Sequence, residues 1–199
     1  EIKREYFVSH EYNALLIKIK SEKAISADFL LESLLKFKTE NTNNGLILFG
    51  KAPYFVNCYN GDGKNNRYKE NVVYEENKGI HFCVKLNIQT DGEIMNNESG
   101  ECSVLNAKEI VVFVSSANNF KDYKTPIEKS DIDYFSICKK AIDRAVLDGY
   151  EKIKTVHTKD FSSFFNRCGI DLGDIPIGIF TPDMFGKNIK PQSAALYFA

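Results

Sequence analysis

The sequence has no tryptophan, and only two methionines, five prolines and three histidines occur among its 199 residues. Independent sugar-binding modules commonly present indole rings, so the lack of tryptophan weakens that interpretation, although tyrosine can substitute. Lysine plus arginine (26) nearly balance aspartate plus glutamate (27), which leaves a formal charge of −1. A near-neutral chain has no general attraction to phosphate backbones or anionic lipids, so we expect no nucleic acid and no membrane among its partners.

Long apolar runs are also absent. No stretch approaches the roughly 18 uninterrupted apolar residues that a membrane span requires. The first residues, Glu1–Val8, have the pattern of a strand and not of a signal peptide. Because the chain begins and ends inside structured patterns, we expect both ends to be boundaries within a longer protein. The sequence does not decide between a cytoplasmic and a secreted location, because we expect the native N-terminus to lie before Glu1.

Five cysteines occur, an odd number, at wide spacings and without a C-x-x-C pair. They are Cys58, Cys83, Cys102, Cys138 and Cys168. This pattern argues against a zinc site or a disulfide framework. It favours buried or half-buried thiols in a reducing compartment. We therefore expect no metal and no cofactor.

Alternating apolar residues predict strands over most of the first 117 residues. In the clearest case, 80–89, the even positions are apolar and the odd ones mostly polar, which predicts a strand with one buried face. A shorter alternation at 15–20 places Lys18 and Lys20 toward water. Residues 27–38 are apolar on both faces and predict a central strand, and the β-branched run 108–117 predicts another buried one.

Polar turn sequences separate these runs and support antiparallel pairing. They are Asn43–Gly45, Asn60–Gly63 and Asp91–Gly92. Many strands with polar turns, and no helices alternating with them, indicate an antiparallel sandwich and not an α/β sheet.

The pattern becomes helical after Pro126. Ser130 followed by Asp133 resembles a helix N-cap with an acidic third position, and Gly149 can end that helix. A second helical pattern begins at Tyr150 and ends before Gly169. We therefore divide the chain into a β-sandwich at 1–126, a helical linker module at 127–173 and an extended segment at 174–199.

A search for catalytic motifs finds no active site. No G-x-S-x-G nucleophile elbow and no H-E-x-x-H metal motif is present. His157 and Asp160 share one helical face, because residues three apart on a helix are neighbours. A helix-surface or interdomain hydrogen bond is the favoured interpretation of this pair, ahead of a catalytic one. The predicted set of catalytic residues is therefore empty.

One segment, 155–173, resembles the H-x-x-D-(aromatic)-x-x-(L/F)-F-x-R-x-x-(L/I)-D-L-G stretch of glycoside hydrolase family 95, the α-L-fucosidase family. Further segments resemble motifs of the same family and follow in the same order. They are Arg4–Ser9, Leu15–Ile19, Gly50–Pro53, Val73–Glu75, Lys78–Phe82, Thr181–Asp183 and Ala194–Phe198. The resemblance therefore extends over nearly the whole chain.

The resemblance implies a mainly β fold, an antiparallel β-supersandwich whose first strands precede Glu1, followed by a short two-helix linker module. That module would lead into an (α/α)6 catalytic barrel of the same parent chain, which is the expected partner domain. The parent would hydrolyse terminal fucosyl linkages of a fucosylated glycan with inversion. The catalytic groups of the family lie in the barrel, so this part alone is expected to be inactive.

The same resemblance implies a role for the second helix. We expect an apolar face there, because the barrel would cover it in the parent. The expected interdomain contacts are His157, Asp160, Phe161, Phe164 and Phe165. The alternative is a free-standing β-sandwich that binds carbohydrate or protein, for which no barrel is needed.

Overall fold

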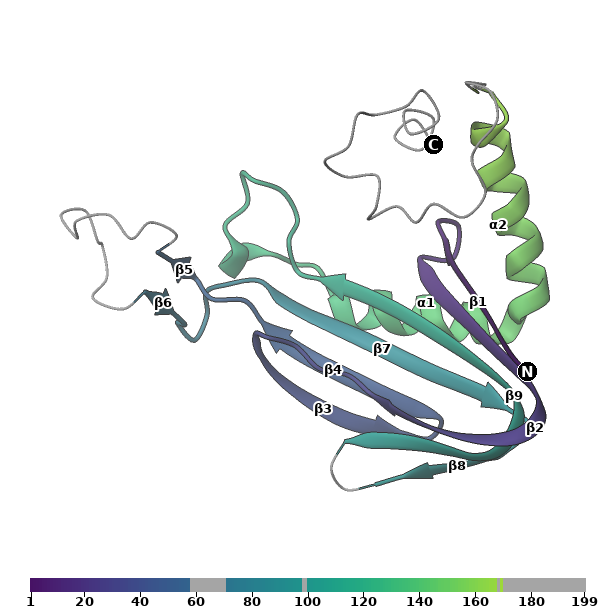
Figure 1. Cartoon of the computed structure of the whole chain (residues 1–199). Coiled ribbons are helices and arrows are strands. Elements are labelled where there is room, and N and C mark those ends of the chain that lie inside the picture. The colour runs from purple at the N-terminus through teal and green to yellow at the C-terminus, as the bar shows by residue number, and fades with distance from the viewer. Residues whose placement is uncertain (58–70, 98–99, 168, 170–199) are drawn as a thin grey trace, which may run out of the picture. The chain divides into compact units, whose positions relative to one another are not determined.

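The computed structural model describes residues 1–57, 71–97, 100–167 and 169. Within these residues the chain is mainly antiparallel β structure followed by two helices, as predicted (Figure 1). A first compact unit comprises Glu1–Lys154, and a second begins at Thr155. The predicted turn at 60–63 and the predicted extended segment at 174–199 lie outside the described residues. No helix in the described part of the chain is long and apolar enough to cross a membrane.

The described strands form one large sheet and one short ribbon. They are β1 (Ile2–Ser9), β2 (Ala14–Leu30), β3 (Lys36–Thr42), β4 (Gly45–Lys51), β5 (Phe55–Val56), β6 (Val72–Val73), β7 (His81–Thr90), β8 (Glu93–Asn96) and β9 (Glu101–Asn118). The large sheet has the order β1-β2-β9-β7-β4-β3, with β8 also paired to β9, and the ribbon pairs β5 with β6. All pairings are antiparallel.

The two longest strands, β2 and β9, are irregular at the same level. Their register shifts between Lys20 and Ala27, and Asn106 in β9 has a positive φ of 56°. Bulges of this kind bend a strand and increase its twist. On one side of the irregularity β9 pairs with β7, and on the other side it pairs with β8. The bend therefore divides the sheet into two layers.

The sandwich core lies between these layers. Its buried members come from β4, β7 and both halves of β9: Leu46, Leu86, Ile88, Cys102, Val104, Ala107, Ile110 and Val112. Side-chain hydrogen bonds also join the layers: for example, Asn96 Nδ2 donates to Thr42 O (2.9 Å), and Thr39 Oγ1 donates to Leu31 O (3.2 Å). Each fully buried Leu, Ile or Val contributes about 1.5–3 kcal/mol relative to an exposed position. The predicted sandwich is thus confirmed.

The second face of β7 is also covered, which the sequence pattern did not predict. Helix α1 (Tyr134–Asp148) packs across this face through buried Cys138, Ile142 and Ala145 (Figure 1). Beneath the helix, Cys83 of β7 is fully buried. The prediction of one buried face was therefore wrong, because a helix distant in sequence supplies the second cover.

Residues 27–38 are not a single central strand, contrary to the prediction. β2 ends at Leu30, and β3 begins at Lys36 as an edge strand. Leu34, in the connection, is fully exposed. The apolar residues of this segment belong to the end of β2, the start of β3 and the exposed connection between them. They therefore do not mark a strand that is buried on two sides.

The helices begin and end at residues that stabilise their ends. The side chain of Asp133 caps α1 by accepting a hydrogen bond from Ser136 N (3.0 Å), so the prediction of Ser130 as the cap was wrong. Ser130 instead donates through Oγ to Asn119 O (2.6 Å). Gly149 ends α1 with a φ of 76°, as predicted. The second helix, α2, spans Tyr150–Phe165, and a short 3₁₀ turn (η1) spans Ile127–Lys129.

Candidate site at the junction of the sheet and the helices

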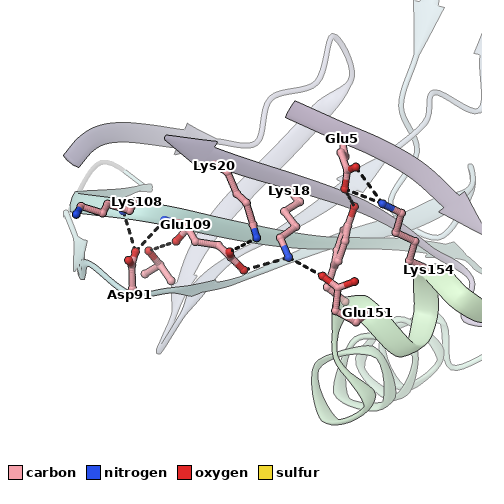
Figure 2. A network of polar contacts seen from close by, with 10 residues as sticks. Glu5, Lys18, Lys20, Asp91, Lys108, Glu109, Glu151 and Lys154 are labelled. Carbon is pink, nitrogen blue, oxygen red and sulfur yellow. Dashed lines mark hydrogen bonds and ion pairs between the residues drawn. The ribbon is translucent and has the colours of Figure 1, made fainter. Parts of the chain in front are cut away.

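Lys18 lies in β2 on the face of the sheet that α1 covers, and its side chain is only 7% exposed. Its Nζ lies 3.1 Å from Glu109 of β9 and 2.7 Å from Glu151 in the first turn of α2. It also lies 4.5 Å from the centre of the Tyr150 ring. Figure 2 shows Lys18 between Glu109 and Glu151. The prediction that Lys18 faces water was therefore wrong, because β9 and the start of α2 enclose it.

The charges at this point stabilise one another. Burial acts to lower the pKa of Lys18, but hydrogen bonds to Glu151 and Glu109 and the attraction of both carboxylates outweigh it, so the pKa is raised. Burial likewise acts to raise the pKa of Glu109, but hydrogen bonds to Lys20 and Lys18 outweigh it, and this pKa is lowered. Lys20 Nζ lies 2.9 Å from Glu109. Lys18 and Glu109 therefore stay ionised at neutral pH.

Asp91, in the turn after β7, holds the Glu109 main chain in place. Its Oδ1 accepts hydrogen bonds from the backbone N–H groups of Glu109 and Lys108, each at 2.9 Å (Figure 2). These bonds, led by that from Glu109, lower the pKa of Asp91. Thr90 Oγ1 donates to Glu109 O at 2.8 Å. The turn therefore fixes the position from which Glu109 reaches Lys18.

A second group of contacts joins β1 and the connection that follows it to the junction of the two helices. Tyr150 Oη donates to Glu5 (2.7 Å), and Lys154 Nζ lies 2.9 Å from the same carboxylate. Tyr12 Oη donates to Asp148 at 2.6 Å. We call the set joined through Lys18 and Glu5 the junction network: Glu5, Lys18, Lys20, Glu109, Tyr150, Glu151 and Lys154. It ties the first turn of α2 to β1, β2 and β9.

Beside this network lies an open pocket of about 620 Å³. It is lined by Lys18, Gln89, Thr90, Asp91, Glu109, Val111, Asp148, Gly149, Tyr150, Glu151 and Lys152. The pKa of each of Asp91, Glu109 and Asp148 is lowered, in Asp148 chiefly by a hydrogen bond from Lys152. An acid catalyst for glycoside hydrolysis must keep its proton near neutral pH. These carboxylates instead suit ion pairing and the binding of hydrogen-bond donors.

Acid is expected to weaken the network. The folded-state pKa of Glu109 lies below its ordinary value of 4.5. Its contribution is therefore fully present above that pH and is lost as the pH falls through the lowered folded value. In urea unfolding at a series of pH values, we expect the wild type to lose stability more steeply below about pH 4.5 than Glu109→Gln. Equal slopes for the two proteins would contradict this assignment.

Two of the sequence motifs meet at the opposite end of β7. Gly50, at the end of β4, pairs with Phe82 of β7, and a methyl group at Gly50 would overlap the Phe82 ring. Ala52 N donates to Ile80 O at 2.8 Å. Gly79 has a φ of 91°, a backbone conformation that favours glycine. The glycines of these motifs thus have steric and backbone reasons that are independent of catalysis.

Gly50→Ala is expected to lower the free energy of unfolding by about 1–3 kcal/mol, the usual cost of overpacking. The added methyl would have to displace the Phe82 ring. The double variant Gly50→Ala/Phe82→Leu should lose less than the sum of the two single changes, because leucine leaves room for the methyl. Urea unfolding of the four proteins measures this coupling, and strict additivity would contradict the proposed clash.

The residues predicted for interdomain contact all lie in α2. His157, Phe161 and Phe165 stand one turn apart, with ring centres 6.0 Å and 5.2 Å apart in succession. Phe161, Phe164 and Phe165 are 55%, 64% and 52% exposed. We call His157, Phe161, Phe164 and Phe165 the aromatic row. Asp160 lies in the same helix, and the interdomain role of all five residues stays a prediction.

Three of the cysteines, Cys83, Cys102 and Cys138, are buried free thiols, as predicted. Cys58 and Cys168 lie outside the described residues. Across the described ranges no group of three or more His, Cys, Asp and Glu residues is arranged to hold a metal ion.

His81 lies at the start of β7, and burial, together with the nearby Lys51, lowers its pKa.

Sequence reasoning missed Lys18 and Glu109, although a signal was available. Ala14 and Leu16 precede Lys18 on the same face of β2, and both are buried. An apolar pair beside a lysine on one strand face indicates that this face is covered. A lysine under such cover requires carboxylate partners.

The fold and the site define a mainly β domain with a helical extension, whose described polar pocket is built for ion pairing. A comparison with family models matches residues 1–123 to the glycosyl hydrolase family 65, N-terminal domain. This match covers more than half of the 199 residues, and the chain belongs to that family. A search of the curated proteins gives no match. The prediction of a glycoside hydrolase N-terminal domain is confirmed, with family 65 and not family 95 as the matched description.

Proposed function

We propose that this chain is the non-catalytic N-terminal domain of an α-L-fucosidase-like glycoside hydrolase and that it braces an (α/α)6 catalytic barrel of the same parent chain. The observation that carries the proposal is the family match over residues 1–123. The collinear motifs that resemble family 95, above all the segment 155–173, support the fucosidase assignment. The substrate class is a glycan with terminal fucose.

The aromatic row supports the bracing role. Three phenylalanines more than half exposed on one helix are costly in water, since burying each contributes about 1.5–3 kcal/mol. A catalytic barrel that packs on them would recover part of that energy. His157 and Asp160, on the same helix, would supply polar contacts at the margin of such an interface.

The chemistry would lie outside this chain. An inverting glycosidase needs one carboxylic acid that protonates the leaving oxygen and a second group that activates water on the opposite face of the sugar. The carboxyl groups of Asp91, Glu109 and Asp148 in the pocket have lowered pKa values and are ionised at neutral pH. They suit a structural network better than acid catalysis.

A hydrolysis assay tests the proposal. The protein encoded by the full reading frame should release the chromophore from an aryl α-L-fucoside, and proton NMR should show the β-anomer of fucose first, because inversion changes the configuration. Residues 1–199 alone should release none. Hydrolysis of another glycoside in preference to the fucoside would overturn the substrate class while leaving the domain assignment intact.

The second candidate is a free-standing binding sandwich, which the open polar pocket of about 620 Å³ favours. A pocket of this volume suits a small ligand, and its carboxylates could accept hydrogen bonds from sugar hydroxyls. Calorimetric titration of residues 1–199 with a fucosylated oligosaccharide separates the candidates. Saturable binding that Glu151→Gln weakens would favour the binding module, and no heat of binding would favour the brace.

A further inference from the structure

Two buried thiols face one another where α1 crosses β7. Cys83 lies in β7 and Cys138 in α1, and both side chains are fully buried. The Cys138 thiol donates to Ser115 O of the sheet at 3.1 Å, and the Cys83 thiol lies 3.5 Å from Tyr134 O of the helix. Each sulfur therefore reaches the main chain of the facing element.

This close approach depends on small side chains. Cys83 pairs with Ala117 on the neighbouring strand, so Ser115 lies diagonally beside it on the same face. The Cys138 thiol raises the pKa of Cys83, and the Cys83 thiol acts to lower the pKa of Cys138, so the two side chains are neighbours. Tyr134 precedes Cys138 by one helical turn, so its carbonyl lies on the same side of the helix as the Cys138 side chain. The helix and the strand thus bring the two sulfurs within reach of one another.

We propose that Cys83 and Cys138 close to an intramolecular disulfide that fastens α1 to the sheet under oxidising conditions. The oxidant is a low-molecular-weight disulfide such as oxidised glutathione. The Cys138 thiolate attacks one of its sulfurs and expels one glutathione thiol. The Cys83 thiolate then attacks the Cys138 sulfur of the mixed disulfide and expels the second. The two cysteines lose two protons and two electrons, and the oxidant is reduced to two thiols.

The native contact protects the pair from rapid reaction. Burial raises the pKa of Cys138, and it raises that of Cys83 to about 12, so both remain thiols in the closed state. Oxidation therefore proceeds through opening of the first turns of α1. Phe135 and Ile137 in these turns are 41% and 46% exposed, so part of the helix surface that must lift is already in water.

The reaction would change stability more than structure. A disulfide between these positions closes a long loop and restricts the unfolded chain, which stabilises the folded state. The bond would join α1 to the sheet covalently, near the N-terminal end of the helix. Oxidation would then oppose separation of the helical segment from the sandwich.

The test uses the 199-residue chain carrying Cys58→Ser and Cys168→Ser. Only Cys83, Cys102 and Cys138 can then react. The protein is incubated with oxidised glutathione in a low concentration of urea, trapped with iodoacetamide, and mapped by tryptic mass spectrometry without reduction. We expect a peptide pair joined through Cys83 and Cys138, Cys102 recovered as the alkylated thiol, and a higher urea midpoint that a reductant reverses. Cys83→Ala and Cys138→Ala are the matched controls, and each should lose this gain.

Three results would overturn the proposal. The first is recovery of both cysteines as alkylated thiols after prolonged incubation. The second is a stable glutathione adduct on Cys138, which would show that Cys83 cannot reach it. The third is a joined pair containing Cys102. None of these results bears on the assignment as a glycoside hydrolase domain.

Discussion

Removing both carboxylate partners of Lys18, in Glu109→Gln/Glu151→Gln, is expected to lower the free energy of unfolding by about 2 kcal/mol. Breaking a buried ion pair so that one charge remains unpaired costs about 3–5 kcal/mol. Lys18 is 7% exposed, but Glu109 and Glu151 are 40% and 77% exposed, so solvent screening reduces that figure. Glutamine keeps the shape of both side chains and removes only the charge. Urea unfolding at neutral pH measures the loss.

The reverse change, Lys18→Met, is the matched control and should cost less than about 1 kcal/mol. Methionine fills the space of the lysine stem, and the two carboxylates it leaves can return to water. Glu109 also keeps its ion pair with Lys20. A larger loss in Lys18→Met than in the double glutamine variant would show that the buried lysine matters through packing and not through its charge.

Replacing the three phenylalanines of the aromatic row by serine should separate the role of this helix in the parent from its role in the isolated chain. In residues 1–199 we expect almost no change in the urea midpoint, because these side chains are more than half exposed. In the parent enzyme we expect both the rate of hydrolysis and the thermal midpoint of the barrel to fall. A loss of about 1.4 kcal/mol of interface energy would reduce the activity about tenfold.

Lys159→Ala is the control for this prediction, since Lys159 lies exposed in the same helix but outside the aromatic row. It should leave both the activity and the thermal midpoint of the parent unchanged. Equal effects of the control and the triple variant would assign the change to helix stability. An unchanged triple variant would show that the barrel does not pack on these side chains.

Much of the fold could be predicted from local patterns. The alternation in 80–89 identified β7, and the β-branched run 108–117 identified the second half of β9. Gly149 marked the end of α1, because only a glycine readily takes the conformation observed there. These features depend on neighbours in sequence, which is why a pattern shows them.

The errors share a different cause. Alternation within β2 could not show that α2 would enclose Lys18, since its partner Glu151 lies 133 residues away. The apolar run 27–38 could not show the break at Leu31–Leu35, because exposed leucines look the same in sequence as buried ones. Ser130 looked like a helix cap, but the structure uses its hydroxyl to bind the main chain at Asn119.

One part of the candidate site could be predicted from the sequence, and the other part could not. The aromatic row follows from helical spacing alone, and the structure shows its three phenylalanines exposed in α2. The junction network could not be predicted, because it depends on the register of β2 with β9 and on where α2 begins. The resemblance over 155–173 carried the interdomain hypothesis without any knowledge of that network.

The most direct test of the central claim is to read the coding sequence downstream of the Ala199 codon. A non-catalytic N-terminal domain that braces a barrel requires an open frame of several hundred further residues, with helical hairpins and paired acidic and asparagine positions. A stop codon at or near that point would contradict the account and favour a free-standing binding domain.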